Sequence, residues 1–295
     1  MKQNSAFTRW WHGSQVRTSR QTLSPRLWLR YLTADQRRLP DFLIAGAMKA
    51  GTTSLFGYLA GHPDCRPSLT KEVHYFDKNF ERGEKWYRLH FPRGRTCTRS
   101  QPSLPLCFES SPYYMFDPRV PERLREQLPA AKVIFLLRNP IDRAFSHYQH
   151  SVLRGREPLT FEQAIEAEPD RLACEAERML GDGAYLSPAH QHFSYLARGI
   201  YADQLARWRD HFPDQQLLVL ESEQLFRSPH EAFAKTLAFL GLKPWEPAKF
   251  QNLYAGRYRD SIQPKTGRRL EEYFAPHNTR LFAMLGQRFD WQAND

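Results

Sequence analysis

The sequence predicts an α/β protein of three layers, in which a central parallel sheet is flanked by helices. Short, continuous apolar runs at residues 41–47, 132–138 and 217–220 have the composition of strands that are buried on both faces. Stretches with apolar residues three or four positions apart separate these runs, as in amphipathic helices. Strands that alternate with helices favour a parallel sheet covered on both sides.

The helices are predicted in chain order from their apolar faces and start signals. Pro140 suits the first turn of a helix after the second strand, and Ser228 and Glu231 have the spacing of a capping box after the third. The predicted helices span residues 53–61, 141–152, 160–168 and 200–212, with a further one between Ser228 and Gly241.

The length and the distribution of charge predict one domain with a basic extension. A chain of 295 residues buries about 75% of its unfolded surface. Residues 1–40 carry eight basic residues and one acidic residue, which is most of the net charge of +10. We expect a basic N-terminal arm over 1–40 and one α/β domain over 41–295. The arm can contact nucleic acid or anionic lipid, but it has no nucleic-acid-binding module, so a solvated extension is favoured and no stable nucleic-acid partner is expected.

Composition also bears on membranes and thiols. The longest apolar run, Phe42–Met48, has 7 residues, whereas a membrane helix needs about 20. No apolar segment follows the basic N-terminus, so we expect no signal peptide, no membrane span and a cytoplasmic location. The four cysteines lack the density of a disulfide scaffold and are expected to be free thiols, although Cys97 and Cys107 could meet. No feature assigns an oligomeric state.

A glycine-containing loop at residues 46–54 joins the first strand to the first helix. Backbone amides in such a loop, together with the positive end of a helix, bind phosphate, so a P-loop-like site is predicted here. Gly46 and Gly51 fit the nucleoside-triphosphate pattern, but Thr52 stands where that pattern has lysine, and Lys49 comes three residues earlier. A turn of small residues that serves packing alone is the alternative. The ammonium group in mid-loop argues against it.

This loop resembles the 5′-phosphosulfate loop of the sulfotransferases that use 3′-phosphoadenosine 5′-phosphosulfate. A second resemblance is an arginine at a strand end with a serine eight residues later, which in that family hold the 3′-phosphate. Similarity to the subgroup that includes the heparan sulfate enzymes extends over about residues 41–291. The resemblance implies that the phosphosulfate donor, and its product adenosine 3′,5′-bisphosphate, contact Lys49, Ala50, Gly51, Thr52, Thr53, Ser54, Arg138, Ser146, Tyr201 and Arg257.

The activity implied by the resemblance is sulfuryl transfer to a hydroxyl or amine of a carbohydrate-like or small-molecule acceptor. This reaction needs a base for the acceptor proton and positive charge at the leaving phosphate. Lys49 suits the second role, and Glu72 matches the catalytic glutamate of the subgroup. The catalytic residues are predicted to be Lys49, Glu72 and His74, and the acceptor site is predicted to contain Lys71, Glu72, His74, Asp77, Ser111 and Tyr113.

The segment around Glu72 has two interpretations. In an extended strand, alternation would place Glu72 and His74 on one face and turn Asp77 away, and a dry pocket would raise the pKa of Glu72. The alternative is a solvated Lys71–Glu72 pair above packed aromatic residues.

Departures from the subgroup concern the acceptor and a late loop. Ser110 stands where the heparan sulfate enzymes often have a lysine on the substrate side, so the prediction of an acidic polysaccharide as the acceptor is weaker. Of the cofactor loop that those enzymes have near the C-terminus, only Gly256 and Arg257 are present here. Residues 155–197 carry no motif, and their position predicts a lid on the acceptor side. The aromatic residues that would line this lid, or form its own small core, are Tyr185, His190, His192 and Tyr195.

Two other classes of protein remain possible from the sequence. A P-loop-type nucleotide kinase would need magnesium and a lysine at position 52. A non-catalytic nucleotide or nucleic-acid binder would use the basic arm and scattered aromatic residues. No set of His, Cys and carboxylate residues has metal-ligand spacing, so no metal is expected.

Overall fold

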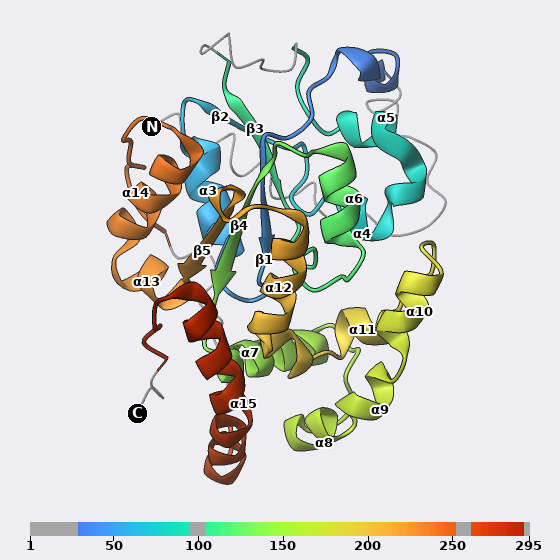
Figure 1. Cartoon of the computed structure of the whole chain (residues 1–295), viewed down its shortest axis with the longest axis vertical. Helices are drawn as coiled ribbons and strands as arrows, with labels where there is room; N and C mark the ends of the chain where they lie inside the picture. Colours follow the sequence, from blue (N-terminus) through green and yellow to red (C-terminus); the bar gives the residue numbers. More distant parts are fainter. Residues whose placement is uncertain (1–28, 95–103, 252–260, 292–295) are drawn as a thin grey trace.

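A computed structural model gives the structure of residues 29–94, 104–251 and 261–291. In these ranges the strands form one parallel sheet in the order β2-β3-β1-β4-β5 (Figure 1). The strands are β1 (Phe42–Gly46), β2 (Cys65–Pro67), β3 (Leu106–Ser110), β4 (Lys132–Leu137) and β5 (Leu217–Glu221). In register, Phe42 lies between Phe108 of β3 and Lys132 of β4, and Val133 lies beside Leu217 of β5.

Helices cover both faces of the sheet, as predicted. Figure 1 shows α3 (Thr52–Gly61), α13 (Ser222–Arg227) and α14 (Pro229–Leu240) on one side, and α6 (Val120–Gln127) and α12 (Tyr201–His211) on the other. The rings of Tyr58 in α3 and Phe233 in α14 meet edge to face at 6.0 Å. On the opposite side, Trp208 of α12 packs on Phe135 of β4 with ring centroids 5.1 Å apart. The main core is therefore the double-sided packing around β1 and β4, whose apolar side chains are fully buried.

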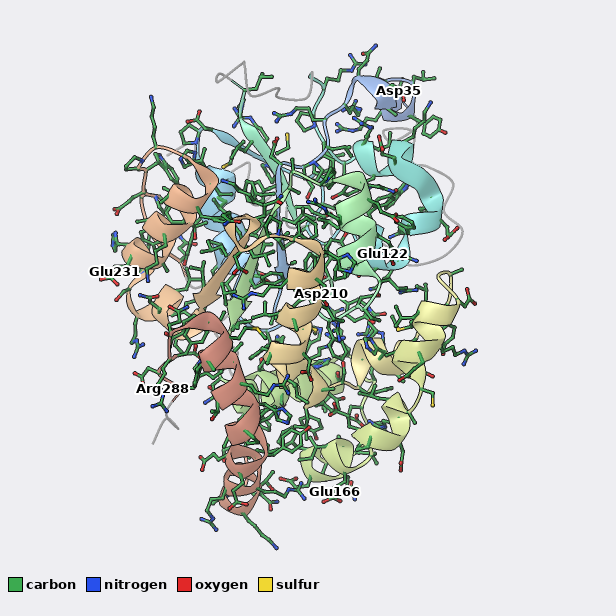
Figure 2. The ribbon with its side chains drawn as sticks, in the orientation of Figure 1. Asp35, Glu122, Glu166, Asp210, Glu231 and Arg288 are labelled. Atoms are coloured by element: carbon green, nitrogen blue, oxygen red, sulfur yellow. The ribbon has the colours of Figure 1, made fainter. Side chains whose placement is uncertain are left out.

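The remaining helices extend beyond these layers. Figure 1 shows α8 to α11 as a group beside the lower part of the sheet, and α15 as a long helix against α7 and α12. Charged side chains such as Glu166 and Glu231 extend outward from the outer helices (Figure 2). These helices are α4 (Tyr75–Lys78), α5 (Gly83–Arg88), α7 (Pro140–Leu153), α8 (Phe161–Glu166), α9 (Glu168–Leu172), α10 (Glu175–Gly181), α11 (Pro188–His192) and α15 (Pro264–Leu285), with 3-10 turns η1 (Ala34–Gln36), η2 (Phe80–Arg82), η3 (Ala197–Gly199) and η4 (Asp214–Gln216).

The predicted strands and helices are confirmed, with corrections at their ends. The helix predicted over 160–168 is α8 followed by α9, and β2, β3 and α15 were not predicted. The capping box predicted at Ser228 is wrong: this residue precedes α14, but its side chain makes no capping hydrogen bond. A capping box occurs instead at Thr160, whose hydroxyl accepts from the Gln163 amide while the Gln163 side chain accepts from the Thr160 amide.

The part of the predicted arm that the structure describes packs against the domain. Arg30 donates to the carbonyls of Leu89 and Phe91, and Arg37, which is buried, also donates to Phe91. The division at residue 40 stays a prediction. The predicted Cys97–Cys107 contact also stays one, because Cys97 lies outside the described residues and Cys107 is buried in β3. None of the helices in the described ranges is both long and apolar enough to cross a bilayer.

The sheet topology positions a site at one edge. Because all the strands are parallel, the loops after β1, β2, β3 and β4 leave the same edge of the sheet. From β1 the chain passes to β2 and then to β3 on one side, and the crossover after β3 places β4 on the other side of β1. A crevice at the carboxyl end of β1 is therefore the expected place for a ligand.

Candidate active site

The loop between β1 and α3 has the features of an anion site. Gly51 precedes α3 in a left-handed conformation (φ 88°), and no side chain caps the helix. In the described part of the chain, the amides of Thr52 and Thr53 have no hydrogen-bond acceptor, so these N–H groups can receive an anion at the positive end of the helix. Ala50, in the same loop, is buried.

Side chains of this loop divide into two groups. Lys49 and Thr53 are partly exposed, whereas Thr52 and Ser54 are buried. The Ser54 hydroxyl hydrogen-bonds the Tyr58 hydroxyl one turn along α3, and its amide donates to the Gly51 carbonyl. Ser54 therefore contributes to the packing of α3, and its contact with the donor stays a prediction.

A second predicted cofactor contact lies beside the loop. Arg138 follows β4, and its guanidinium donates to the Lys49 carbonyl at 3.3 Å. The Tyr201 hydroxyl donates to the Arg138 carbonyl at 2.8 Å, and Asp142 forms an ion pair with the guanidinium at 3.5 Å. Ser146 lies on α7, where it is 2% exposed. The neighbouring strands β1 and β4 thus bring Lys49, Arg138 and Tyr201 together.

The predicted catalytic acid–base residues form one ionic cluster. Lys71 binds one carboxylate oxygen of Glu72 at 2.9 Å, and Nε2 of His74 lies 3.4 Å from the other. Nδ1 of His74 donates to Asp77 at 2.6 Å. Asp77 is fully buried, whereas the Glu72 side chain is 45% exposed, so the carboxylate of Glu72 is open to an acceptor.

The backbone of this segment is not the extended strand considered in the first of the two interpretations. Glu72 and His74 have left-handed φ values of 63° and 54°, and α4 begins at Tyr75. The helical turn brings Asp77 back to His74, so the expectation that Asp77 faces away is wrong. Among the described non-glycine residues, positive φ occurs at Lys49, Glu72, His74 and Cys174. Such conformations are strained and concentrate at functional sites.

The charges of the cluster lower the pKa of Glu72, whereas a raised pKa was predicted. The surrounding protein keeps part of the Glu72 carboxyl from water and so favours its neutral form, but the charges and hydrogen bonds of Lys71 and His74 lower the pKa of Glu72 well below its ordinary value. For His74, burial disfavours the imidazolium, but the charge of Asp77 and the hydrogen bonds of Asp77 and Glu72 raise the pKa to about 9. The expectation of a raised Glu72 pKa is therefore wrong, because an imidazolium and an ammonium flank the carboxylate.

Ser111 and Tyr113 lie directly behind this cluster. The Ser111 hydroxyl accepts the His74 amide at 3.1 Å, and Ser111 is fully buried. The Tyr113 hydroxyl hydrogen-bonds Nδ1 of His190 at 2.8 Å, and Tyr113 is 7% exposed. Of the predicted acceptor residues, Ser111 therefore supports the backbone of the cluster and Tyr113 joins it to residues 155–197. Arg257 lies outside the described residues, and its role stays a prediction.

The family of the chain follows from its match to known proteins. Residues 39–292 match the sulfotransferase domain model. The chain belongs to the sulfotransferase family. This sulfotransferase is 29% identical over 279 residues to heparan sulfate glucosamine 3-O-sulfotransferase 6 of Homo sapiens, a match that covers 87% of the chain and 75% of that protein. It is 32% identical over 297 residues to the bifunctional heparan sulfate N-deacetylase/N-sulfotransferase 2 of Homo sapiens, covering 88% of the chain and 31% of that protein.

A solved structure has the same architecture. The crystal structure of the sulfotransferase from Alicyclobacillus acidocaldarius aligns with a TM-score of 0.65 at 30% identity, over 86% of this chain and 99% of that one. The predicted P-loop-like α/β fold and the predicted family are therefore confirmed. The chain is an enzyme of the sulfotransferase class rather than a kinase or a non-catalytic binder.

Arg198 is a residue of this sulfotransferase to which the sequence analysis assigned no role. Its guanidinium donates to the His190 and Gln191 carbonyls at 3.1 and 2.6 Å and to Sδ of Met48 at 3.0 Å. It also lies over the ring of Tyr113, 4.8 Å from the centroid. Arg198 therefore ties the predicted lid to the phosphate loop. Only the three-dimensional contacts reveal this role, because the partners lie far apart in sequence.

His150 is a second residue that the sequence analysis missed. Burial and the positive charges of Lys49, Arg154 and Arg156 lower the pKa of His150 to about 4, and the charge of Glu72 acts in the opposite direction. Lys49 and Glu72 thus lie within electrostatic reach of the same imidazole. Its position one turn after Ser146 on α7 was a usable signal, since residues four apart share a helix face.

The predicted lid residues divide between the two roles that were left open. Tyr195 is fully buried in a small second core with Phe161 and Phe274, and Tyr185 donates to Glu175. His190 contacts Tyr113, as described above, and His192 hydrogen-bonds Arg156 at 3.3 Å. Across residues 29–94, 104–251 and 261–291, no cluster of three His, Cys, Asp or Glu side chains is arranged to hold a metal ion.

Proposed function

We propose that this sulfotransferase transfers a sulfuryl group from 3′-phosphoadenosine 5′-phosphosulfate to a hydroxyl or amine of a carbohydrate. The observation that carries the proposal is the hydrogen bond of 3.3 Å from the Arg138 guanidinium to the Lys49 carbonyl, which joins the two predicted phosphate contacts in one site at the end of β1. The relatives that act on heparan sulfate support a carbohydrate acceptor.

The residues of the phosphate loop fit the donor. The amides of Thr52 and Thr53, which lack acceptors in the described residues, would hold the 5′-phosphate at the start of α3. Arg138 would hold the 3′-phosphate with Ser146, and its bond to the Lys49 carbonyl keeps the two ends of the site in fixed relation. When bound, the donor supplies the sulfuryl group: the bond between its sulfur and the phosphate oxygen breaks as the hydroxyl oxygen or amine nitrogen of the acceptor bonds to that sulfur.

Lys49 and Glu72 divide the chemistry of the transfer. The Lys49 ammonium stabilises the negative charge that develops on the leaving phosphate. Glu72 is ionised at neutral pH because its pKa is low, so its open carboxylate can accept the acceptor proton. An anionic donor nearby raises the pKa of Glu72 and makes it a stronger base. His74 holds the carboxylate in place from its position between Glu72 and Asp77.

Cations around Glu72 favour an acceptor that carries negative charge. Ser110 is fully buried in β3, so this position offers no substrate-side cation. Lys78 replaces that function in our proposal: it follows Asp77 in α4, and its ammonium lies 6.0 Å from the centroid of the Tyr113 ring. A cation held near the base in this way would attract an acidic sugar.

The proposal is tested by calorimetry and by a transfer assay. Adenosine 3′,5′-bisphosphate should bind without magnesium and more tightly than ATP with magnesium. Labelled donor should pass sulfate to an acidic oligosaccharide, with the product identified by mass spectrometry. A preference for ATP with magnesium, or no transfer to any carbohydrate, would overturn the proposal. The predicted cytoplasmic location and the absence of a metal requirement stay predictions, and unchanged transfer in the presence of a chelator tests the second.

A further inference from the structure

Glu109 is a carboxylate that the proposed mechanism does not use, yet it lies next to the catalytic cluster. It stands near the end of β3 and is fully buried. Its carboxylate accepts hydrogen bonds from the hydroxyls of Tyr87 at 2.5 Å, Ser111 at 2.8 Å and Tyr114 at 3.1 Å. A buried carboxylate is costly even when it is hydrogen-bonded, so a place in the core beside a functional segment indicates a role.

The direction of these hydrogen bonds determines how Ser111 and Tyr114 bind the backbone of the catalytic segment. An ionised carboxylate has no proton to donate, so each of the three hydroxyls must point its proton at Glu109. The oxygens of Ser111 and Tyr114 are then left as acceptors. Ser111 accepts the amide of His74 at 3.1 Å, and Tyr114 accepts the amides of Tyr75 at 2.7 Å and Phe76 at 3.3 Å.

These three amides are the ones that the start of a helix leaves without partners. α4 begins at Tyr75, and His74 precedes it with a left-handed backbone and no capping side chain of its own. The two hydroxyls that Glu109 orients therefore cap α4 from another part of the chain. They hold the strained backbone at His74, from which the imidazole reaches both Asp77 and Glu72.

We propose that Glu109 is a positioning residue for sulfuryl transfer, which orients the hydroxyls of Ser111 and Tyr114 so that His74 is held between Asp77 and Glu72. The inference rests on the proposed role of Glu72 as the base. A loss of this orientation would release the His74 backbone, weaken both contacts of the imidazole and leave the Glu72 carboxylate without a fixed position. Donor binding would be little affected, because the hydrogen bonds of this network run to the start of α4 and not to the phosphate loop.

The test is Glu109→Gln, measured at pH 8. Burial raises the pKa of Glu109 to about 7, so the parent carboxylate is ionised at this pH. The amide group of glutamine must donate to one of the hydroxyls, which reverses that bond. We expect kcat to fall about tenfold or more, with the Kd of adenosine 3′,5′-bisphosphate unchanged within about twofold. The pKa of His74, followed by NMR, should fall from about 9 toward its ordinary value of 6.5.

Two further variants separate position from charge. Ser111→Ala and Tyr114→Phe keep the charge of Glu109 but remove the hydroxyls, and each should also lower kcat and the His74 pKa. If Glu109→Gln does not fold, these two variants test the positioning role in its place. In a Ser111→Ala/Tyr114→Phe background, Glu109→Gln should change kcat by less than about twofold, because residues that act through one another are not additive.

Glu157→Gln is the control for loss of a buried carboxylate. Glu157 is buried and accepts from Arg171 and Tyr195, away from α4. The Glu157→Gln substitution should lower the melting temperature and leave the His74 pKa unchanged. An unchanged His74 pKa in Glu109→Gln, Ser111→Ala and Tyr114→Phe would overturn the positioning role, whatever the effect on kcat. The NMR measurement needs no turnover, so this failure is distinct from a parent enzyme that transfers no sulfate.

Discussion

Arg138 donates a hydrogen bond to the carbonyl of Lys49 at 3.3 Å, although 89 residues separate them in the sequence. The contact exists because β4 lies directly beside β1 in the parallel sheet, so the two strands end together. A guanidinium that donates to the Lys49 carbonyl and pairs with Asp142 still has N–H groups left for an anion. The two predicted phosphate contacts therefore belong to one site.

Arg138→Ala should weaken binding of adenosine 3′,5′-bisphosphate. The loss of a charge-assisted hydrogen bond is expected to raise the Kd by about 10- to 100-fold, while the Kd of adenosine 5′-phosphate changes little. Calorimetry with both nucleotides measures the difference. Arg125→Ala is the matched control, since its exposed guanidinium donates only to the Pro129 carbonyl among the described residues. Equal weakening of both nucleotides would refute the assignment to the 3′-phosphate.

Glu72→Gln should abolish most of the turnover and leave donor binding intact. Glutamine keeps the shape of the side chain but cannot accept the acceptor proton, so kcat should fall by about 100-fold or more. Steady-state rates at saturating acceptor and the Kd of adenosine 3′,5′-bisphosphate are the measurements. Glu122→Gln, at the exposed position on α6 labelled in Figure 2, serves as the control. A rate equal to that of the parent would show that another group takes the proton.

The stability of the protein should fall as pH rises from 7 to 9. The pKa of His74 is raised from 6.5 to about 9 in the folded state, so the folded protein holds a proton that the unfolded chain releases. This contribution is complete below pH 6.5 and is lost as pH rises through 9. Its size is about 3 kcal/mol.

Denaturant titrations at pH 7, 8 and 9 measure this loss in the parent and in Asp77→Asn, which lacks the carboxylate that does most to raise the His74 pKa. The variant should be less stable at pH 7 and show a flatter dependence between pH 7 and 9. His230→Gln, at an exposed site on α14, should retain the slope of the parent. If the free energy of unfolding of Asp77→Asn fell between pH 7 and 9 as steeply as that of the parent, His74 would not be the cause of the fall.

Gly51→Ala should damage the phosphate loop more than an equivalent change elsewhere. A Cβ at Gly51 would lie 2.8 Å from Cζ of Phe226, and the backbone is left-handed. We expect a loss of about 2–3 kcal/mol in the free energy of unfolding and weaker nucleotide binding. Gly241→Ala has a similar φ of 75°, and no described atom lies within 4 Å of its Cβ, so it should cost only about 1–2 kcal/mol and leave binding unchanged. Equal effects on binding would argue against the loop as the anion site.

Local patterns in the sequence were enough to predict the layers and the phosphate loop. The apolar runs of β1, β4 and β5 and the helix after Gly51 depend on neighbours within a few residues, which the sequence displays directly. β2 is only three residues long, and Pro276 interrupts the pattern of α15. Both were missed because their stability comes from packing rather than from local propensity.

The amino-acid sequence by itself determined the α/β class, the loop around Lys49 and the residue types that sulfuryl transfer requires. Only the tertiary structure decided the protonation of Glu72 and His74, the return of Asp77 to the cluster and the support from Glu109. A pKa depends on charges and burial within a few ångströms, and the left-handed backbone from which the His74 imidazole meets both Glu72 and Asp77 is held by the Ser111 hydroxyl of a distant segment. Distances of this kind arise from residues more than thirty positions apart, which no local pattern encodes.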